Sequence, residues 1–349
     1  MGAKKIGIAG LVVLGISLGI YFLKRGEVSD NTLHIYTWSN YFPEGVIQDF
    51  TKRTGIKIEF SYMSSNEELM AKLRAGATGY DLIQPSDYMV RKMIALSMLL
   101  PLEHSQLTNL SNLDATYASP PYDPGQRYAV PFTWGTTGIA INTAKITIPE
   151  EGVGWKMLVD SPDPKHTSVL DDMREVFALV LKFKGQSINA TEPDVLETAK
   201  GDIAGLKSKI LLFAAEPKPL LQKEEISIAH IYSCDGAQAQ KENSKIRYFI
   251  PKEGGTLWTD NLAIPSSTRK RKEAHTFINY ILEPDVAVSI VREKSLATPN
   301  RVARLKLSPE EQQDPVIYPP KEILEKMQYL EEIGPTLDVV SRMWTELKS

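Results

Sequence analysis

Cysteine is nearly absent from this chain of 349 residues. Cys234 is its only cysteine, so the chain can form no intrachain disulfide and has no N-terminal cysteine for lipid modification. Any membrane attachment must therefore come from the polypeptide itself. A chain of this length can still fold outside the cytoplasm without disulfides, because it can bury enough apolar surface. Cys234 follows an apolar run in IAHIYSC, which favours a buried small side chain.

The signals of several other function classes are also missing. The net charge is -3, and after residue 30 there is no basic stripe apart from the short run at 269–272, so no positive field is available for nucleic-acid phosphates. The five histidines lack metal-ligand spacing, and neither a Gly-x-Ser-x-Gly elbow nor a phosphate-binding glycine loop with lysine occurs. We predict no nucleic-acid partner, no metal or other cofactor, and no catalysis.

One long apolar run is present, at residues 6–23, with two basic residues on each side. Its length is at the lower edge for a spanning helix and long for the apolar part of a cleaved export signal. No small-x-small cleavage pattern follows it, so we favour an uncleaved anchor and keep a signal peptide as the alternative. The equal flanking charges do not orient the run. Residues 1–29 are thus predicted to be a signal or membrane-anchor segment.

Strand and helix patterns alternate after this segment. The predicted elements are a strand at 33–37, a helix at 45–54, a strand at 56–62, a helix at 66–75 and a strand at 80–84. Such a βαβαβ unit forms a parallel sheet, and ligands bind beyond the carboxyl ends of its strands. Trp38 and the turn at 86–88 lie at such ends.

The pattern changes near residue 128, which suggests a second lobe. Two strands, 129–135 and 138–142, are predicted around the glycine-rich TWGTTG sequence, as in a crossover between lobes. Further predicted elements are a strand at 167–170, helices at 172–184 and 195–208, strands at 210–213 and 227–232, and a helical stretch over the final forty residues. The length, with 42% hydrophobic and 24% charged residues, also favours a soluble protein of two domains.

Acidic and aromatic residues occur together in three short segments. They are Asp172 and Glu175 in LDDMREVF, Trp258 and Asp260 in LWTD, and Trp38 in IYTWSNY. Aromatic faces attract cations, and carboxylates supply the opposite charge that a desolvated ammonium needs. Asp172 and Glu175 also lie three residues apart in the first turn of a predicted helix, where the helix dipole stabilises anions. These residues predict a pocket for an organic cation such as a polyamine.

With these motifs the chain resembles the bacterial periplasmic spermidine/putrescine-binding proteins, which are substrate receptors of ABC importers. The ordered segments that carry the resemblance are IYTWSNY, TGIKIEF, SNEELMAKL, YDLIQPSDY, VPFTWGTTGIAIN, LDDMREVF, PKEGGTLWTDNLAIP, LEPDVA and ATPN. The resemblance implies an α/β fold of the two-lobed type II periplasmic-binding class, with mixed sheets flanked by helices and a ligand cleft between the lobes. Lobe 1 is predicted at 30–136 plus 260–302, and lobe 2 at 137–259 plus 303–349.

The resemblance also implies ten ligand-binding residues: Trp38, Ser39, Ser86, Tyr88, Asp172, Glu175, Tyr232, Asp235, Trp258 and Asp260. Asp172 and Glu175 match the acidic pair of the spermidine-binding branch, whereas Asp235 matches an acid of the putrescine-binding branch. Leu296 replaces an expected tyrosine, and Leu330 replaces a glutamine that binds an amine. These two leucines place putrescine slightly ahead of spermidine, although the presence of both acid types leaves the choice open.

Other interpretations of the same residues remain. Asp172 could be a helix N-terminal acid, Glu175 could pair with Arg174, and Asp235 could be a turn residue. The chain could also bind another small solute, or act as a ligand-loaded sensor. The implied partners are a polyamine and an ABC permease of the inner membrane. The protein is expected to be a periplasmic monomer, tethered through residues 6–23 if that run is not cleaved.

Overall fold

The computed structural model describes residues 31–76 and 78–349, so the predicted signal or anchor at 6–23 lies outside the described part. The strands are β1 (Thr32–Thr37), β2 (Lys57–Tyr62), β3 (Leu82–Ile83), β4 (Ala129–Asn142), β5 (Thr167–Leu170), β6 (Leu212–Ala214), β7 (Ile228–Tyr232), β8 (Ile246–Phe249), β9 (Thr256–Ala263) and β10 (Gln328–Tyr329).

The helices differ widely in length. They are α2 (Glu44–Thr54), α3 (Asn66–Arg74), α4 (Asp87–Ala95), α5 (Lys156–Val159), α6 (Met173–Phe183), α7 (Pro193–Lys207), α8 (Lys218–Gln222), α9 (Ser233–Glu242), α10 (Arg271–Ile281), α11 (Pro284–Lys294), α12 (Arg301–Arg304), α13 (Pro309–Gln312), α14 (Lys321–Leu324) and α15 (Thr336–Lys348). Short 3₁₀ helices lie at His104–Gln106, Thr108–Asn112, Ala115–Tyr117 and Pro164–His166.

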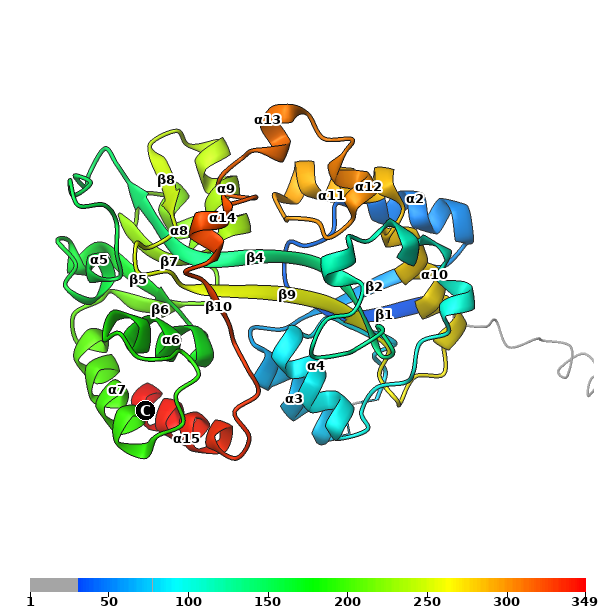
Figure 1. The fold of residues 1–349 in the computed structure, drawn as a ribbon, viewed down its shortest axis with the longest axis horizontal. Helices are drawn as coiled ribbons and strands as arrows, with labels where there is room; N and C mark the ends of the chain where they lie inside the picture. The colour runs from blue at the N-terminus through cyan, green and yellow to red at the C-terminus, as the bar shows by residue number, and fades with distance from the viewer. Residues whose placement is uncertain (1–30, 77) are drawn as a thin grey trace, which may run out of the picture.

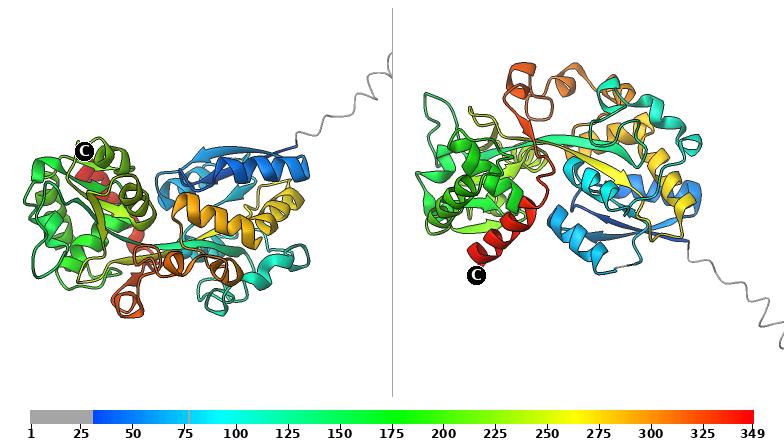
Figure 2. Two further views of the ribbon diagram at one scale, coloured as in Figure 1. Left: turned by 90° about the horizontal axis from the view of Figure 1, so that it is seen from above. Right: turned by 60° about the horizontal axis from the view of Figure 1, so that its bottom comes forward.

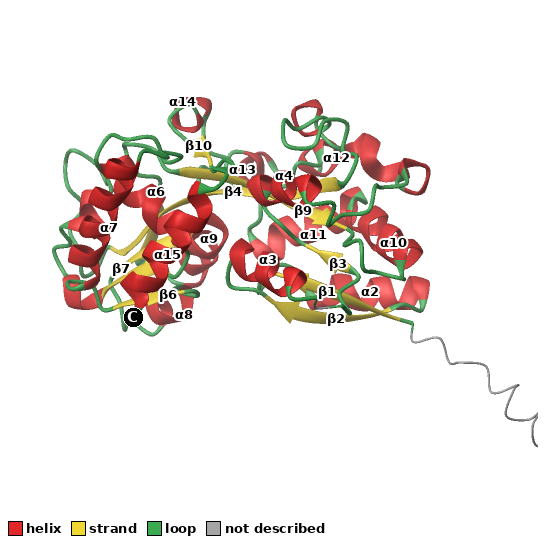
Figure 3. Ribbon diagram, turned by 90° about the horizontal axis from the view of Figure 1, so that it is seen from below, coloured by secondary structure: helices red, strands yellow, loops and turns green. Residues whose placement is uncertain are grey.

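The elements form two lobes that β4 and β9 connect (Figure 1; Figure 2). The first lobe holds β1 to β3 with α2, α3, α4, α10 and α11, and the second holds β5 to β8 with α5 to α9 and α15. The strand order is β2-β1-β3-β9-β4-β7-β5-β6, with helices on both faces (Figure 3). This is the predicted two-lobed α/β fold. Its exact boundaries, at 136/137, 259/260 and 302/303, stay a prediction.

The opening βαβαβ unit forms as predicted, because β1 pairs in parallel with both β2 and β3. Gly55 ends α2 in a left-handed conformation with φ 73°, as a glycine after a helix favours. Phe50 and Phe277 pack edge to face in the core on one side of this sheet, and Leu69 and Met89 belong to a separate core cluster.

The prediction of two strands around TWGTTG is wrong. Residues 129–142 form one continuous strand, β4. Its first half pairs with β9, and its second half pairs with β7 and β8. Gly135 permits a close approach and does not break the strand, since a Cβ atom there would lie 2.4 Å from Cζ2 of Trp258.

The prediction that the final forty residues are helical is also largely wrong. Only α15 is a long helix in this region, and the segment before it contains the short helix α14 and the strand β10. β10 pairs in parallel with β9. The two prolines of the VIYPP sequence cannot donate backbone hydrogen bonds, which favours an extended segment over a continuous helix.

Candidate ligand-binding site

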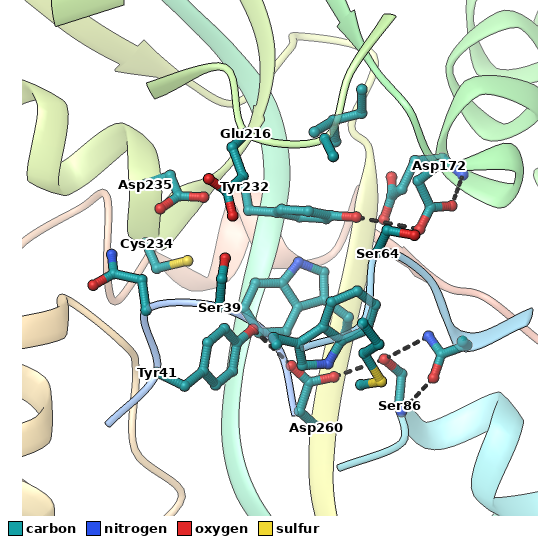
Figure 4. Close-up of a pocket in the computed structure, with 18 of the residues that line it drawn as sticks. Ser39, Tyr41, Ser64, Ser86, Asp172, Glu216, Tyr232, Cys234, Asp235 and Asp260 are labelled. Carbon is teal, nitrogen blue, oxygen red and sulfur yellow. Dashed lines mark hydrogen bonds between the residues drawn. The ribbon is translucent and has the colours of Figure 1, made fainter. Parts of the chain in front are cut away.

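A cavity of about 290 Å³ lies between the two lobes. Its walls include all ten predicted ligand-binding residues: Trp38, Ser39, Ser86, Tyr88, Asp172, Glu175, Tyr232, Asp235, Trp258 and Asp260. Figure 4 shows the side chains of both lobes directed toward this space. The structure therefore brings residues together that are more than 200 positions apart in the chain. That they contact a ligand stays a prediction.

The lining is strongly acidic. Among the described residues that line the cavity, eight carry a carboxyl group and one, Lys294, carries an ammonium. The acids are Glu68, Asp87, Asp171, Asp172, Glu175, Glu216, Asp235 and Asp260. Buried carboxylates need positive partners or hydrogen-bond donors to remain charged. Glu68 and Asp171 already pair with Lys72 and Lys348. The remaining excess of acidic groups suits a ligand with more than one positive charge.

Asp260 lies in β9 at one wall of the cavity, where the side chains of Ser86 and Tyr41 hold its carboxylate. Trp258 and Asp260 are two residues apart in β9 and thus project from the same face of the strand. The Ser86 hydroxyl donates to Asp260 Oδ1 at 2.6 Å, and the Tyr41 hydroxyl donates to Oδ2 at 2.8 Å. Asn66 fixes Ser86, because its side chain bonds both the Ser86 hydroxyl and the Ser86 backbone N–H.

Burial makes the Asp260 carboxyl harder to ionise. Asp260 is 2% exposed, and this burial raises its pKa to about 6, although the hydrogen bonds from Ser86 and Tyr41 act in the opposite direction. A cation bound next to the carboxylate would lower the pKa again. The two hydroxyl donors leave acceptor capacity on the carboxylate, since each oxygen has two lone pairs.

Asp172 and Glu175 are positioned by the start of α6. Asp172 caps this helix by accepting from the backbone N–H groups of Arg174 and Glu175 at 2.9 and 3.1 Å, as Asp commonly does at the N-cap. Its other oxygen accepts from the Tyr232 hydroxyl at 3.3 Å. The interpretation of Asp172 as a helix N-terminal acid is therefore correct, and the same side chain also lines the cavity.

Glu175 is bound by hydroxyl groups and not by arginine. Thr137 and Thr256 donate to its carboxylate at 3.0 Å and at 2.9 and 2.7 Å. Burial and the nearby charge of Asp172 raise the pKa of Glu175 to about 8. The guanidinium of Arg174 instead donates to the Glu331 carbonyl and to Asn189 Oδ1, each at 3.2 Å.

Aromatic rings form the remaining walls. The rings of Tyr232 and Trp258 meet edge to face with centroids 6.0 Å apart, and Trp38 lines the same cavity. Such rings attract cations and cover alkyl chains. Leu296 and Leu330 also line the cavity and are almost fully buried, so they contribute apolar surface where the resemblance implied polar groups.

Asp235 lies in the first turn of α9. Burial raises the pKa of this carboxyl to about 6, which the positive charge of Lys218 partly opposes and the negative charge of Glu216 increases. The turn interpretation of Asp235 is therefore wrong, because the residue is helical.

Sequence reasoning missed several residues that support or line this site. Tyr41 is the last residue of the IYTWSNY segment, and Asp87 lies between the predicted site residues Ser86 and Tyr88, so both motifs carried a usable signal. Burial raises the pKa of Asp87 to about 8, and its carboxylate accepts from the backbone N–H of Thr259 at 3.2 Å. Glu67 accepts from the Tyr88 hydroxyl at 3.1 Å.

The ligand-free protein is expected to lose stability as the pH rises from about 5 to about 8. The folded-state pKa values are about 8 for Glu175 and Asp87, about 7 for Glu67, and about 6 for Asp235 and Asp260, all raised mainly by burial. Unfolded carboxyls titrate near pH 4, so the folded state holds more protons across this window and the free energy of unfolding falls with increasing pH.

Differential scanning calorimetry without ligand measures this effect as a melting temperature several degrees lower at pH 8 than at pH 5. Glu175→Gln should reduce the difference, because it removes one carboxyl with a raised pKa. A melting temperature that rises steadily from pH 5 to pH 8 would contradict the burial of these acids.

No helix within 31–76 and 78–349 is both long enough and apolar enough to cross a membrane. In the same part of the chain, no three histidine, cysteine or acidic side chains are grouped so that they could hold a metal ion.

Comparisons with known proteins give a consistent result. A family model described as bacterial extracellular solute-binding protein matches residues 45–319. The spermidine/putrescine-binding periplasmic protein of Escherichia coli K12 is 34% identical over 344 residues, covering 98% of this chain and 97% of its own length. The putrescine-binding periplasmic protein PotF of the same organism is 32% identical, with 99% and 98% covered.

Solved structures agree with these relatives. A putative spermidine/putrescine ABC transporter protein from Listeria monocytogenes superposes with a TM-score of 0.86 at 32% identity, covering 91% of this chain and 99% of the other. The spermidine/putrescine substrate-binding protein PotD of Streptococcus pneumoniae gives a TM-score of 0.74 at 29% identity, with 91% and 98% covered.

Proposed function

Since the chain belongs to the family of bacterial extracellular solute-binding proteins, we propose that it binds polyamines in the periplasm and delivers them to the permease of an ABC importer. Family membership also establishes that the chain is a binding protein and not an enzyme, as the sequence predicts. The observation that carries the proposal is the cavity between the lobes, in which eight carboxyl groups and one ammonium line the described walls.

In this proposal, the ligand is held by charge neutralisation and ring contacts. Asp260 on one side and Asp172 with Glu175 on the other accept hydrogen bonds from protonated amines, while Trp258 and Tyr232 enclose the alkyl chain. Because these groups come from both lobes, a bound polyamine stabilises the closed arrangement of the lobes. The closed form is then the one that the permease recognises.

Putrescine is the preferred ligand and spermidine the second in this proposal. Leu296 and Leu330 line the cavity without polar atoms. Burying an ammonium against them without an acceptor would cost on the order of several kcal/mol. A short diamine places both of its charges on carboxylates and avoids that cost. The monomeric state and a membrane tether through residues 6–23 also belong to the proposal.

A thermal-shift panel tests the ligand class directly. Putrescine, cadaverine, spermidine, spermine, amino acids and ferric ion would each be added to the purified protein. A specific ligand at one hundred times its Kd stabilises the folded state by about 2.7 kcal/mol, which corresponds to a rise of about 5 °C in melting temperature. We expect this rise for putrescine, a smaller one for spermidine, and none for the amino acids or ferric ion.

A shift with an amino acid or ferric ion, and none with any polyamine, would refute the proposed ligand class and favour a receptor for another solute. Cleavage is measured separately by mass spectrometry of the mature N-terminus. An intact peptide containing Lys4 and Lys5 would establish tethering, and a start near residues 20 to 30 would contradict it.

A further inference from the structure

A chain of four hydrogen-bonded side chains lies at one side of the cavity, and three of its members line the cavity. Asn40 Nδ2 and Lys218 Nζ both donate to Gln238 Oε1 at 2.8 Å. Lys294 Nζ donates to Asn40 Oδ1, also at 2.8 Å. The Gln238 amide in turn donates to the Lys294 carbonyl at 2.7 Å. Asn40 and Lys294 belong to the first lobe, and Lys218 and Gln238 to the second, so this lysine–amide chain spans both lobes.

The lysine–amide chain places positive charge at the Asp235 end of the cavity. Gln238 follows Asp235 by three residues in α9, so the two side chains lie on one face of that helix. Lys294 itself lines the cavity. Burial lowers the pKa of Lys294, the negative charge of Glu293 partly opposes this, and the like charge of Lys218 lowers the pKa further. The two ammonium groups are therefore near enough to repel one another.

Lys218 and Lys294 differ in whether a nearby carboxylate neutralises their positive charge. Lys218 lies 3.6 Å from the carboxylate of Glu242, which partly cancels its field. Lys294 forms no ion pair within 4 Å in the described part of the chain. The hydrogen bond to Asn40 holds the Lys294 ammonium in place. A ligand that extends past Asp235 would therefore approach this positive charge.

We propose that Lys294, reinforced by Lys218, limits the length of the ligand by repelling any ammonium group placed beyond Asp235, so that a diamine is bound in preference to a triamine or tetraamine. This inference rests on the proposed polyamine function and adds a determinant of specificity within it. A diamine ends before the lysine–amide chain, whereas a third amine of a longer ligand would have to lie beside a like charge in a partly desolvated rim.

The lysine–amide chain also joins the lobes, so a loss of closure must be separated from a loss of repulsion. A weakened contact between the lobes reduces the affinity for every polyamine by a similar factor. Removal of repulsion changes the ratio of two affinities. The ratio of the spermidine Kd to the putrescine Kd therefore distinguishes these effects.

The test is calorimetric titration of the full chain with putrescine and with spermidine. Lys294→Met keeps the length of the side chain and removes its charge, and it should lower the ratio of Kd values about fivefold, as expected for one partly exposed charge interaction. Gln238→Met breaks the bridge between lobes and leaves both lysines charged, so it should raise both Kd values while changing their ratio less than twofold.

The matched control is Lys306→Met, which removes an exposed lysine paired with Asp285 outside the cavity and should leave both Kd values unchanged. An unchanged ratio in Lys294→Met would overturn the length limit, even if both affinities fall. A wild-type protein that binds neither amine would overturn the proposed polyamine function itself, which makes the two failures distinguishable.

Discussion

The Asp260→Asn variant is expected to bind putrescine about a hundredfold more weakly than the wild type. Asp260 is almost fully buried at the cavity wall, and hydroxyl groups of Ser86 and Tyr41 already hold its two oxygens. Asparagine keeps the size of the side chain and one acceptor oxygen but removes the negative charge. The bound ammonium would then lack a desolvated partner, which costs about 3 kcal/mol of binding free energy.

Isothermal titration calorimetry at pH 7.5 measures this loss, with circular dichroism to establish that the variant is folded. Asp285→Asn is the matched control, because Asp285 is exposed and pairs with Lys306 on the surface. The control should bind putrescine like the wild type. An Asp260→Asn protein with unchanged affinity would remove this residue from the site.

Replacing both acids at the start of α6, in Asp172→Asn with Glu175→Gln, is expected to abolish measurable binding at millimolar putrescine. The two carboxyl groups are both buried, and the charge of Asp172 adds to burial in raising the pKa of Glu175. Together they neutralise the second amine of the ligand. Their removal leaves a buried ammonium with only neutral acceptors, at a cost of more than about 3 kcal/mol.

The choice of substitutions in this variant separates binding from folding. Asparagine at position 172 remains a good N-cap for α6, and glutamine at 175 can still accept from Thr137 and Thr256. The melting temperature without ligand should therefore stay the same or rise, because two buried acids with raised pKa values are gone. Asp338→Asn with Glu322→Gln makes the same chemical changes at exposed positions and should bind normally. If the Asp172→Asn, Glu175→Gln protein gave titration heats like those of the wild type, Asp172 and Glu175 would be excluded from the binding site.

Most of the fold follows from local sequence patterns. Glycine and proline mark the ends of the strands and helices predicted at 33–84. The structure confirms these predicted ends to within a few residues. The sequence predicts two strands in place of β4 because a glycine inside a strand pattern often marks an interruption. A Cβ atom at Gly138 would lie 2.4 Å from the Phe249 carbonyl oxygen. That constraint is tertiary, so the local sequence does not reveal it.

The acidic wall of the site was predictable for a positional reason. Asp172 is the second residue after β5, and Ser86 closely follows β3, so both lie beyond the carboxyl ends of parallel strands. Glu216 carries the same signal, because it closely follows β6, which is parallel to β5. Lys294 carries no such signal, because it ends the helix α11. Its place at the cavity depends on how the lobes meet, which short-range patterns do not encode.

A crystal structure of the protein grown with putrescine tests the central claim most directly. The account predicts a diamine in the cavity between the lobes, with one ammonium nitrogen within hydrogen-bond distance of Asp260 and the other facing an acid of the opposite lobe. Its carbon chain should lie against Trp258 and Tyr232. A diamine bound outside this cavity, or with neither nitrogen near a carboxylate, would contradict the account.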